Sequence, residues 1–449
     1  AVVGGDYVID HPEDLLVYEY DGSVDRSMPR AVVLPANTEQ ASQVISLAYA
    51  AGVAVVGRGS ATGLSGGAIT PPDGLQIAFP RMNRILNVDT ANRTALVEPG
   101  VINLDLDIHV RKFGMRYAPD PSSQRACSLG GNIAENAGGP HCLAYGTTTN
   151  HVIGMEVILE DGQVVELGGM ARETVGYDLR GAFVGSEGTF GIATKILVRL
   201  LPVPESCQQI VGHGIIPAAL EMIDALSIKA VQNVTDAGYP NDAGAVLLIE
   251  LEGLHEEVEE LSLEVESALW DTGAADVRIA EADDERERLW VGRKTAFGAF
   301  GTIAPNYYLV DGVVPRTRLT QMLRKVTSVS ERYGITIANV FHAGDGNLHP
   351  CMLFDARDPG VMENAMAAAA ELMQECAALG GTLSGEHGIG LEKKEFMPLV
   401  YTDEDMAAMQ RTRNAFAPEN RLNPGKIFPD GSYYHPSPHP ASHTAGLYA

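Results

Sequence analysis

The sequence predicts a fold that mixes helices with strands and that is divided into more than one domain. The chain has 449 residues, whereas a single hydrophobic core rarely grows beyond about 250–300 residues. Residues 31–56 read as strand, helix and strand, and residues 154–167 read as a β-hairpin. Beyond about residue 205 glycine becomes sparser, and helical segments alternate with strands. Pro202 and Pro204 precede this change and predict a hinge.

The first elements can be placed in order along the chain. A short apolar strand at 31–34 stops at Pro35, and Asn37 or Thr38 is suited to cap the helix that follows. A buried strand is expected at 53–56. The helix carries apolar residues at helical spacing: Ala41, Val44, Ile45 and Ala48.

Later elements follow the same rules. Residues 154–160 alternate in polarity, and Asp161-Gly162 supplies a hairpin turn into the strand 164–167. Alternation also predicts a strand at 193–202, and another strand is expected at 245–253. The stretch 256–270 is an amphipathic helix whose many charges are most simply a solvated face.

Composition excludes several classes of protein. The net charge of −26 argues against a general surface for nucleic acid or anionic membranes. No apolar run is long enough to span a bilayer, and the first residues do not resemble a signal peptide, so a cytoplasmic protein is expected. The chain does not begin with Met, so residues upstream can be missing. Five scattered cysteines with no Cys-x-x-Cys pair argue against an iron–sulfur cluster on this chain.

The last twenty residues, 430–449, are rich in proline, serine and histidine. His435, His439 and His443 offer metal-binding groups, but the composition favours a flexible tail.

A glycine-rich loop at 57–67 follows the buried strand. Five glycines in eleven residues allow backbone N–H groups to surround a polyanion such as a diphosphate, and the hydroxyls of Ser60, Thr62 and Ser65 add donors. The loop is neither a P-loop nor the usual dinucleotide fingerprint, and alone it can be a purely structural turn. Two further glycine segments, 130–139 and 185–192, and the turn 119–123 accompany it. Together they indicate one large, flat ligand contacted by backbone.

The order of these segments resembles the FAD-binding domain of the vanillyl-alcohol oxidase superfamily. The motifs at 214–224, 339–350 and 384–390 are similar to those of the family of glycolate oxidase FAD subunits and their D-lactate and D-2-hydroxyglutarate dehydrogenase relatives. The resemblance implies an α+β fold with a two-subdomain FAD-binding domain and an inserted antiparallel-sheet cap domain. It places the FAD domain at 1–203, the cap at 204–415 and a return to the flavin at 416–429.

The same resemblance implies the cofactor residues. Some relatives hold the flavin covalently through a histidine in the first loop; residues 57–68 have none, so non-covalent FAD is expected. The implied cofactor residues are Gly57, Arg58, Gly59, Ser60, Thr62, Gly63, Leu64, Pro121, Ser122, Gly130, Gly131, Asn132, Ala134, Asn136, Gly138, Glu187, Gly188, Gly191, Ile192 and Asn423.

A second group of residues carries side-chain chemistry. His342, His349 and Glu386 are donors that suit Zn²⁺, Mn²⁺ or Fe²⁺, although spacing alone also fits ordinary polar loops. The resemblance places a divalent metal here, beside the flavin. His387 is a candidate base for a substrate hydroxyl, because its unperturbed pKa lies near ~6.5, and FAD N5 would accept the hydride.

Other residues of this group follow from the resemblance. Arg293 would bind the substrate carboxylate, although a surface charge at a helix end is the simpler reading. Asn347 would contact either the substrate or the residues that hold the metal. Asp345 can either form a turn or act as a hydrogen-bond partner of a histidine, and the turn is favoured. Leu309 and Phe297 stand where 2-hydroxyglutarate-specific relatives have a lysine and a hydroxyl residue, which favours small monocarboxylates such as glycolate or D-lactate.

The resemblance also implies partners: an iron–sulfur subunit and a second flavin subunit, through which any contact with the inner face of the membrane would run. Two other functions stay open. One is a stand-alone dehydrogenase for D-lactate or a broader set of D-2-hydroxy acids; the other is a non-catalytic flavoprotein subunit that relays electrons.

Overall fold

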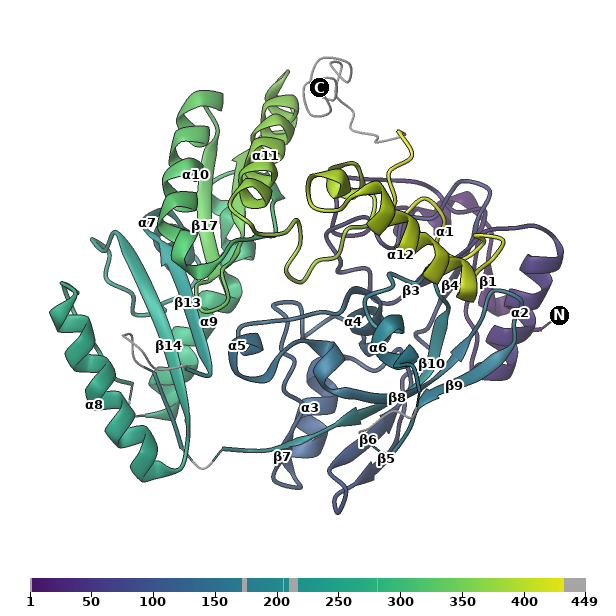
Figure 1. Cartoon of the computed structure of the whole chain (residues 1–449), viewed down its shortest axis with the longest axis horizontal. Coiled ribbons are helices and arrows are strands. Elements are labelled where there is room, and N and C mark those ends of the chain that lie inside the picture. Colours follow the sequence, from purple (N-terminus) through teal and green to yellow (C-terminus); the bar gives the residue numbers. More distant parts are fainter. Residues whose placement is uncertain (1, 172–175, 205, 210–216, 281, 432–449) are drawn as a thin grey trace. The chain divides into compact units, whose positions relative to one another are not determined.

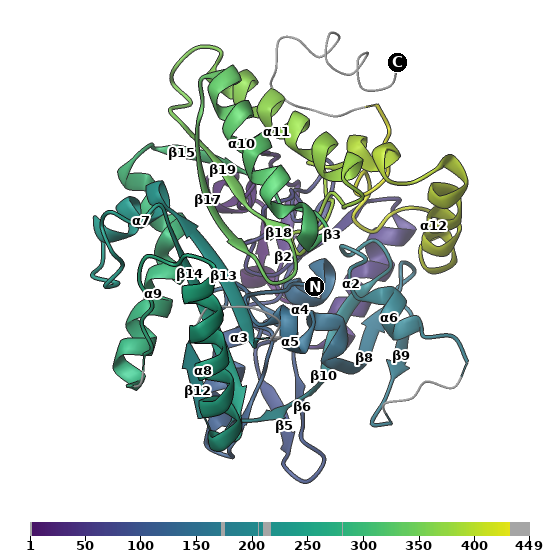
Figure 2. The ribbon, with the colours of Figure 1, turned by 60° about the vertical axis from the view of Figure 1, so that its left-hand side comes forward.

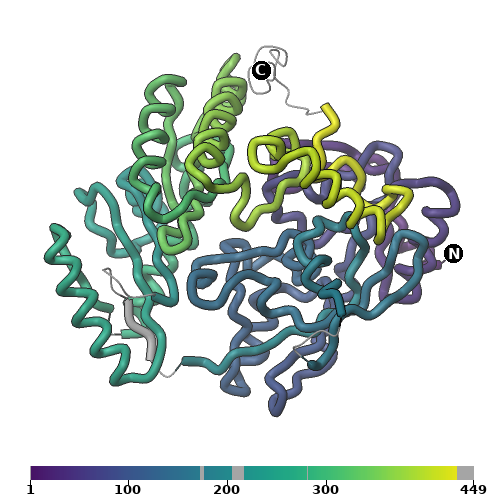
Figure 3. Tube along the Cα trace, in the orientation of Figure 1, coloured from purple at the N-terminus to yellow at the C-terminus, as the bar shows by residue number. Residues whose placement is uncertain are grey.

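The structure, a computed structural model, describes residues 2–171, 176–204, 206–209, 217–280 and 282–431. Within that part of the chain, two units form. The first holds described residues of 2–139, 145–203 and 386–431, and the second holds described residues of 140–144 and 204–385. Figure 3 follows the chain as it leaves the first unit and returns to it near its C-terminal end. The predicted tail lies almost wholly outside the described residues, as do residues 214–216 of one motif.

A small, mostly parallel sheet opens the first unit. Its order is β1 (Val8–Ile9), β2 (Ala31–Val33), β4 (Leu75–Ala78) and β3 (Val55–Arg58), with β2 and β3 parallel to β4. Helix α2 (Thr38–Ala50) joins β2 to β3, and the side chain of Asn37 caps it by accepting from Gln40 N at 2.9 Å. The predicted strand–helix–strand unit and its cap are confirmed. The four predicted apolar positions of α2 are all buried.

A five-stranded antiparallel sheet follows in the same unit. Its order is β5 (Ile85–Asp89), β6 (Thr94–Val97), β10 (Ile192–Arg199), β8 (Val152–Ile158) and β9 (Val164–Gly168). The predicted hairpin is β8–β9, with Ile158 opposite Val164. Gly162 in its turn has φ +91, a conformation that side chains other than glycine rarely adopt. A two-stranded sheet pairs β7 (Met115–Arg116) with β11 (Leu201–Pro202).

Helices cover the sheets of the first unit (Figure 1). Helix α12 begins with a capping box between Thr402 and Asp405. The remaining helices of this unit are α1 (Pro12–Leu15), α3 (Asn103–Arg111), α4 (Leu129–Glu135), α6 (Leu179–Phe183) and α12 (Asp403–Phe416), with 3₁₀ turns η1 (Gly5–Tyr7), η2 (Leu16–Tyr18), η3 (Thr148–Asn150) and η6 (Lys394–Leu399). The short helix α5 (Cys142–Tyr145) lies where the chain passes from the second unit back to the first.

The second unit is built on antiparallel strands. The main order is β12 (Ser206–Gln209), β14 (Ala245–Gly253), β13 (Ala219–Asp224), β17 (Thr336–His342), β18 (Asn347–Leu348) and β16 (Gly312–Val313). β19 (Pro350–Phe354) pairs with both β17 and β15 (Asn306–Leu309). Helix α8 (His255–Asp271) lies along β12 and β14 (Figure 2), as its amphipathic pattern predicts.

Further helices complete this unit. They are α7 (Ala225–Gln232), α9 (Asp283–Ala299), α10 (Leu319–Tyr333) and α11 (Val361–Ala378), with 3₁₀ turns η4 (Phe300–Thr302) and η5 (Arg316–Arg318). Helices α10 and α11 pack side by side (Figures 1 and 2). In the described part of the chain, no helix combines the length and apolar character needed to cross a bilayer.

Candidate functional site

The three glycine segments come together in the first unit. Gly185 N donates to Ile133 O and Glu187 N donates to Ala134 O, both at 2.8 Å, which joins the second segment to the third. The side-chain amide of Asn423 donates to Gly67 O at 2.9 Å and to Glu187 O at 2.6 Å. Asn423, which lies in the predicted C-terminal return to the flavin, therefore joins the first segment to the third.

Several of the glycines are needed because the protein packs closely against itself. A Cβ at Gly130 would lie 2.8 Å from Pro99 Cβ, and one at Gly191 would lie 2.8 Å from Ile158 O. Gly139, at φ +144, lies against Asp120, which joins the second segment to the turn 119–123. At Gly63, in contrast, a Cβ would meet nothing within 4 Å among the described residues. The first loop is therefore open at Gly63.

Buried polar atoms near these segments fit a large polar cofactor. In the described residues, Ser186 Oγ and Asn423 Oδ1 are buried without a hydrogen-bond partner. Such atoms cost free energy unless a ligand or water satisfies them. Ser186 was not among the predicted cofactor residues, although it lies inside the third glycine segment.

Three predicted cofactor residues use their side chains within the protein. Arg58 donates to Tyr20 O and Val17 O. Asn136, at φ +54, ends α4 and accepts from Thr149. The carboxylate of Glu187 accepts from Ile389 N and Gly390 N, both at 2.7 Å, and so holds the segment that follows His387. These side chains therefore shape the loops from within the protein.

The two metal-candidate histidines are placed by a β-hairpin. His342 ends β17, Asn347 opens β18 and pairs with it, and His349 follows. Asp345 Oδ1 accepts from Asn347 N at 3.0 Å, so the predicted turn role of Asp345 is confirmed. The turn also needs Gly346, whose Cβ would lie 2.1 Å from Val314 O. The imidazole rings of His342 and His349 are buried, with centroids 5.0 Å apart.

Each histidine faces a buried carboxylate that the sequence reasoning missed. Glu221 Oε1 lies 2.7 Å from His342 Nδ1, and Asp311 Oδ1 lies 3.7 Å from His349 Nδ1. Burial alone would raise the pKa of Glu221, but the charges and hydrogen bonds of His342 and Arg293 outweigh it and hold that pKa below its usual value. The signal available in the sequence was an acidic residue on the buried face of an alternating strand, since Glu221 has the phase of Ala219 and Ile223.

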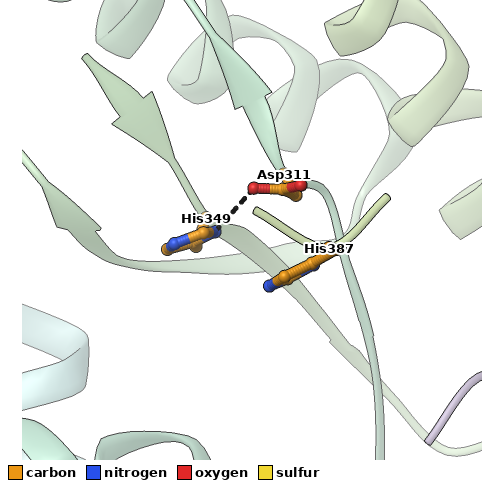
Figure 4. A group of neighbouring side chains, drawn as sticks. All are labelled: Asp311, His349 and His387. Atoms are coloured by element: carbon orange, nitrogen blue, oxygen red, sulfur yellow. Dashed lines mark ion pairs between the residues drawn. The ribbon is translucent and has the colours of Figure 1, made fainter. Parts of the chain in front are cut away.

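Glu386 and His387 come directly after a segment that Asp311 binds. That segment is Ser384-Gly385: Asp311 Oδ2 accepts from Ser384 Oγ at 2.6 Å and from Gly385 N at 3.1 Å. One potential ligand atom from each of His342, His349 and Glu386 lies within 4.8 Å of the others, and the same holds for Asp311, His349 and His387. Figure 4 shows the second group, with the ion pair between Asp311 and His349.

Arg293 is buried rather than a surface charge, so the simpler reading of it was wrong. It lies within α9 with 1% of its surface exposed, and its Nε donates to Glu221 Oε2 at 2.7 Å. Phe297, one turn later on α9, has its ring 6.2 Å from the His349 ring and 5.9 Å from Arg293 Cζ. Leu309 is buried in β15 opposite Cys351. α9 therefore brings Arg293 and the predicted lining residue Phe297 to the histidines.

Two protein families match the chain. A family described as "FAD binding domain" matches residues 29–168, and one described as "FAD linked oxidases, C-terminal domain" matches residues 203–427. The chain belongs to the FAD-linked oxidases. It is therefore an FAD-linked oxidoreductase, and the family inferred from its motifs is confirmed.

Individual relatives are similar over almost the whole chain. The glycolate oxidase subunit GlcD of Escherichia coli is 42% identical over 95% of this chain and 89% of its own length. The subunit GlcD of Bacillus subtilis is 39% identical over 92% of each chain. The D-lactate dehydrogenase of Archaeoglobus fulgidus is 31% identical over 91% of this chain and 95% of its own.

Solved structures confirm the predicted fold class. A p-cresol methylhydroxylase superposes with a TM-score of 0.79 over 97% of this chain and 96% of that one, at 17% identity. A likeness at that identity concerns the fold, an FAD-binding domain joined to an antiparallel-sheet domain.

Proposed function

We propose that this FAD-linked oxidoreductase oxidises a small 2-hydroxy monocarboxylate, glycolate or D-lactate, to the 2-oxo acid. The observation that carries the proposal is the buried pair His342 and His349, with Glu386 in reach of both. The names of the relatives, glycolate oxidase subunit and D-lactate dehydrogenase, point to the same substrate class.

The donor set fits a divalent metal. Two imidazoles and a carboxylate suit Zn²⁺, Mn²⁺ or Fe²⁺. His342 Nδ1 is engaged by Glu221, so His342 would coordinate through its Nε2. Asp311 Oδ2 is engaged by Ser384 and Gly385, so Asp311 fits a supporting role better than that of a ligand. A metal bound here would act as a Lewis acid that stabilises the developing alkoxide of the substrate.

The remaining roles fall to side chains of the chain itself. Oxidation removes a proton from the substrate hydroxyl and a hydride from the α-carbon. His387 is placed beside Glu386 and takes the proton. Arg293 binds the carboxylate next to the reacting carbon, because a guanidinium matches a carboxylate in two hydrogen bonds. Asn347, buried in β18, contacts the substrate. Non-covalent FAD, bound by the three glycine segments, supplies the acceptor for the hydride.

Phe297 supports a small substrate. Its ring lies 6.2 Å from the His349 ring and 5.9 Å from Arg293 Cζ, and it offers neither a charge nor a hydrogen-bond donor to the second carboxylate of a longer substrate. Burying an unpaired carboxylate against an apolar lining costs roughly 3 kcal/mol or more. We therefore place 2-hydroxyglutarate outside the substrate range, by about a hundredfold or more in kcat/KM.

The electrons would leave through partner subunits. The GlcD relatives are named as subunits of glycolate oxidase, and an iron–sulfur subunit and a second flavin subunit are the partners that we propose. The alternative is that the protein passes electrons to a quinone or cytochrome without partner subunits. Reconstitution with candidate partners distinguishes these two routes.

The decisive experiment measures flavin bleaching by substrate in the purified protein. We expect glycolate or D-lactate to reduce the flavin anaerobically, and we expect a chelator to abolish this reduction and Zn²⁺ or Mn²⁺ to restore it. Acid or heat should release the flavin into the supernatant. Equal kcat/KM for 2-hydroxyglutarate with a dye acceptor would contradict the substrate proposal, and flavin retained on the precipitate would contradict non-covalent binding.

A further inference from the structure

Glu221 makes two separate contacts in the interior of the second unit. Its Oε1 lies 2.7 Å from His342 Nδ1, and its Oε2 accepts from Arg293 Nε at 2.7 Å. The side chain is fully buried, and its strand β13 pairs with β17 so that Glu221 stands directly opposite His342. The sheet itself therefore fixes the carboxylate against the histidine.

The first contact determines which ring nitrogen of His342 carries the proton. An ionised carboxylate can only accept hydrogen bonds, so the proton of a neutral His342 must be on Nδ1. The Nε2 lone pair then points away from Glu221, and it is the atom through which His342 would coordinate a metal. A carboxylate in this position also fixes the plane of the ring.

The second contact determines where Arg293 points. The Nε side of the guanidinium faces Glu221, and Nη2 lies 2.7 Å from the same oxygen without forming a hydrogen bond in the described residues. A fully buried guanidinium needs a counter-charge, and Glu221 supplies it. The other N–H groups of the guanidinium would then bind the carboxylate of the substrate.

We infer that Glu221 is a positioning residue that sets the tautomer of His342 and the orientation of Arg293 together. The inference rests on the proposed function, since it assigns a metal to His342 and a substrate carboxylate to Arg293. Glu221 touches neither ligand itself. One carboxylate thus fixes the distance between the two groups that would hold the hydroxyl and the carboxylate of a 2-hydroxy acid.

The test compares Glu221→Gln with Glu250→Gln. Glu250 is a matched control because it is a buried glutamate on the neighbouring strand β14, where it accepts from Trp290 Nε1 and lies near His141. The probe is Zn²⁺ alone, measured by competition with a chelator on flavin-loaded protein. We expect Glu221→Gln to bind Zn²⁺ about 10–100-fold more weakly, while Glu250→Gln binds it as the wild type does.

A second readout reports on the tautomer itself. In metal-free protein labelled with ¹⁵N-histidine, His342 should be protonated on Nδ1 in the wild type and should lose that preference in Glu221→Gln. A merely structural role would lower the melting temperature of both glutamine variants and leave Zn²⁺ affinity and the tautomer unchanged.

The outcomes separate the inference from the proposed function. Wild-type Zn²⁺ affinity in Glu221→Gln, together with loss of binding in His342→Ala, overturns the inference and leaves the metal site standing. Equal Zn²⁺ binding by wild type and His342→Ala overturns the metal site and the inference with it. Should Glu221→Gln fail to fold, the double variant Glu221→Gln with Arg293→Met removes both buried charges; wild-type affinity in that variant overturns the inference.

Discussion

The glycine segments of the first unit and the histidine group of the second are assembled in different ways. In the glycine region the chain holds itself through backbone groups, as when Asn423 donates to the carbonyls of Gly67 and Glu187. At the histidines the contacts join side chain to side chain, as between Glu221, His342 and Arg293. The glycine region depends on positions without a side chain, whereas the histidine group depends on individual charges and protons.

The largest effect is expected from the proton acceptor. His387→Asn keeps hydrogen-bonding capacity but cannot take up a proton, so flavin reduction by substrate should slow by about 10²–10⁴-fold. Stopped-flow absorbance checks this, with flavin content unchanged. His255→Asn, an exposed residue on α8, is the control and should react normally. An unchanged rate in His387→Asn would show that another group accepts the proton.

Removing a metal ligand should come next. His349→Ala leaves an incomplete set of donors, so Zn²⁺ affinity should fall by more than the ~10–100-fold typical of losses in the outer shell. Metal analysis after dialysis checks the prediction. His141→Ala is the matched control, because His141 belongs to another histidine–carboxylate group, with Glu250 and Glu252. Metal lost from His141→Ala but kept by His349→Ala would move the site to that group.

The sequence predicted the parts of the fold that local patterns determine. The β8–β9 hairpin follows from Asp161-Gly162 and strict alternation, and α2 follows from Asn37 and helical spacing. His342 and His349 could be found because a tight, glycine-containing turn separates them by only a few residues.

Long-range partners could not be found in this way. Glu221 lies 121 residues from His342 and 72 from Arg293 in the sequence, and only the pairing of β13 with β17 brings them together. Arg293 for the same reason read as a surface charge: its counter-charge is on a strand that no local pattern connects to α9. The resemblance gave Arg293 a role, but it did not reveal the partner that keeps it buried.

Two glycine substitutions sharpen the account of the first unit. Gly130→Ala would place a Cβ 2.8 Å from Pro99 Cβ and 3.1 Å from Pro99 O, and such overpacking should cost about 1–3 kcal/mol. Gly63→Ala meets nothing within 4 Å among the described residues. It should leave the stability of flavin-free protein nearly unchanged but weaken FAD binding if the cofactor occupies that space. Denaturant titration and flavin fluorescence measure the two effects, and full FAD affinity in Gly63→Ala would remove Gly63 from the cofactor site.

The smallest effect concerns a carboxyl group near the first loop. Burial, with a smaller contribution from Asp21, raises the pKa of Asp25 to about 6. The folded protein therefore binds a proton more tightly than the unfolded chain does, so stability should fall as the pH rises from about 4 to about 6 and stay lower above it. Asp25→Asn removes this titration. It should stabilise the protein at pH 7 by about 1–2 kcal/mol, a figure reduced from the full shift because the group is partly exposed.

Melting temperatures of flavin-loaded protein at pH 5 and pH 7 check the sign. The gain from Asp25→Asn should be larger at pH 7, because the wild-type carboxyl is charged there and the amide is not. Asp73→Asn, at an exposed position, should change neither value. A variant that is destabilised equally at both pH values would mean that the Asp25 carboxylate stabilises the segment around Gly66, whose Cβ position lies 3.3 Å from Asp25 Oδ2. Side-chain charge would then matter in the glycine region as well, and the contrast with the histidine group would be one of degree.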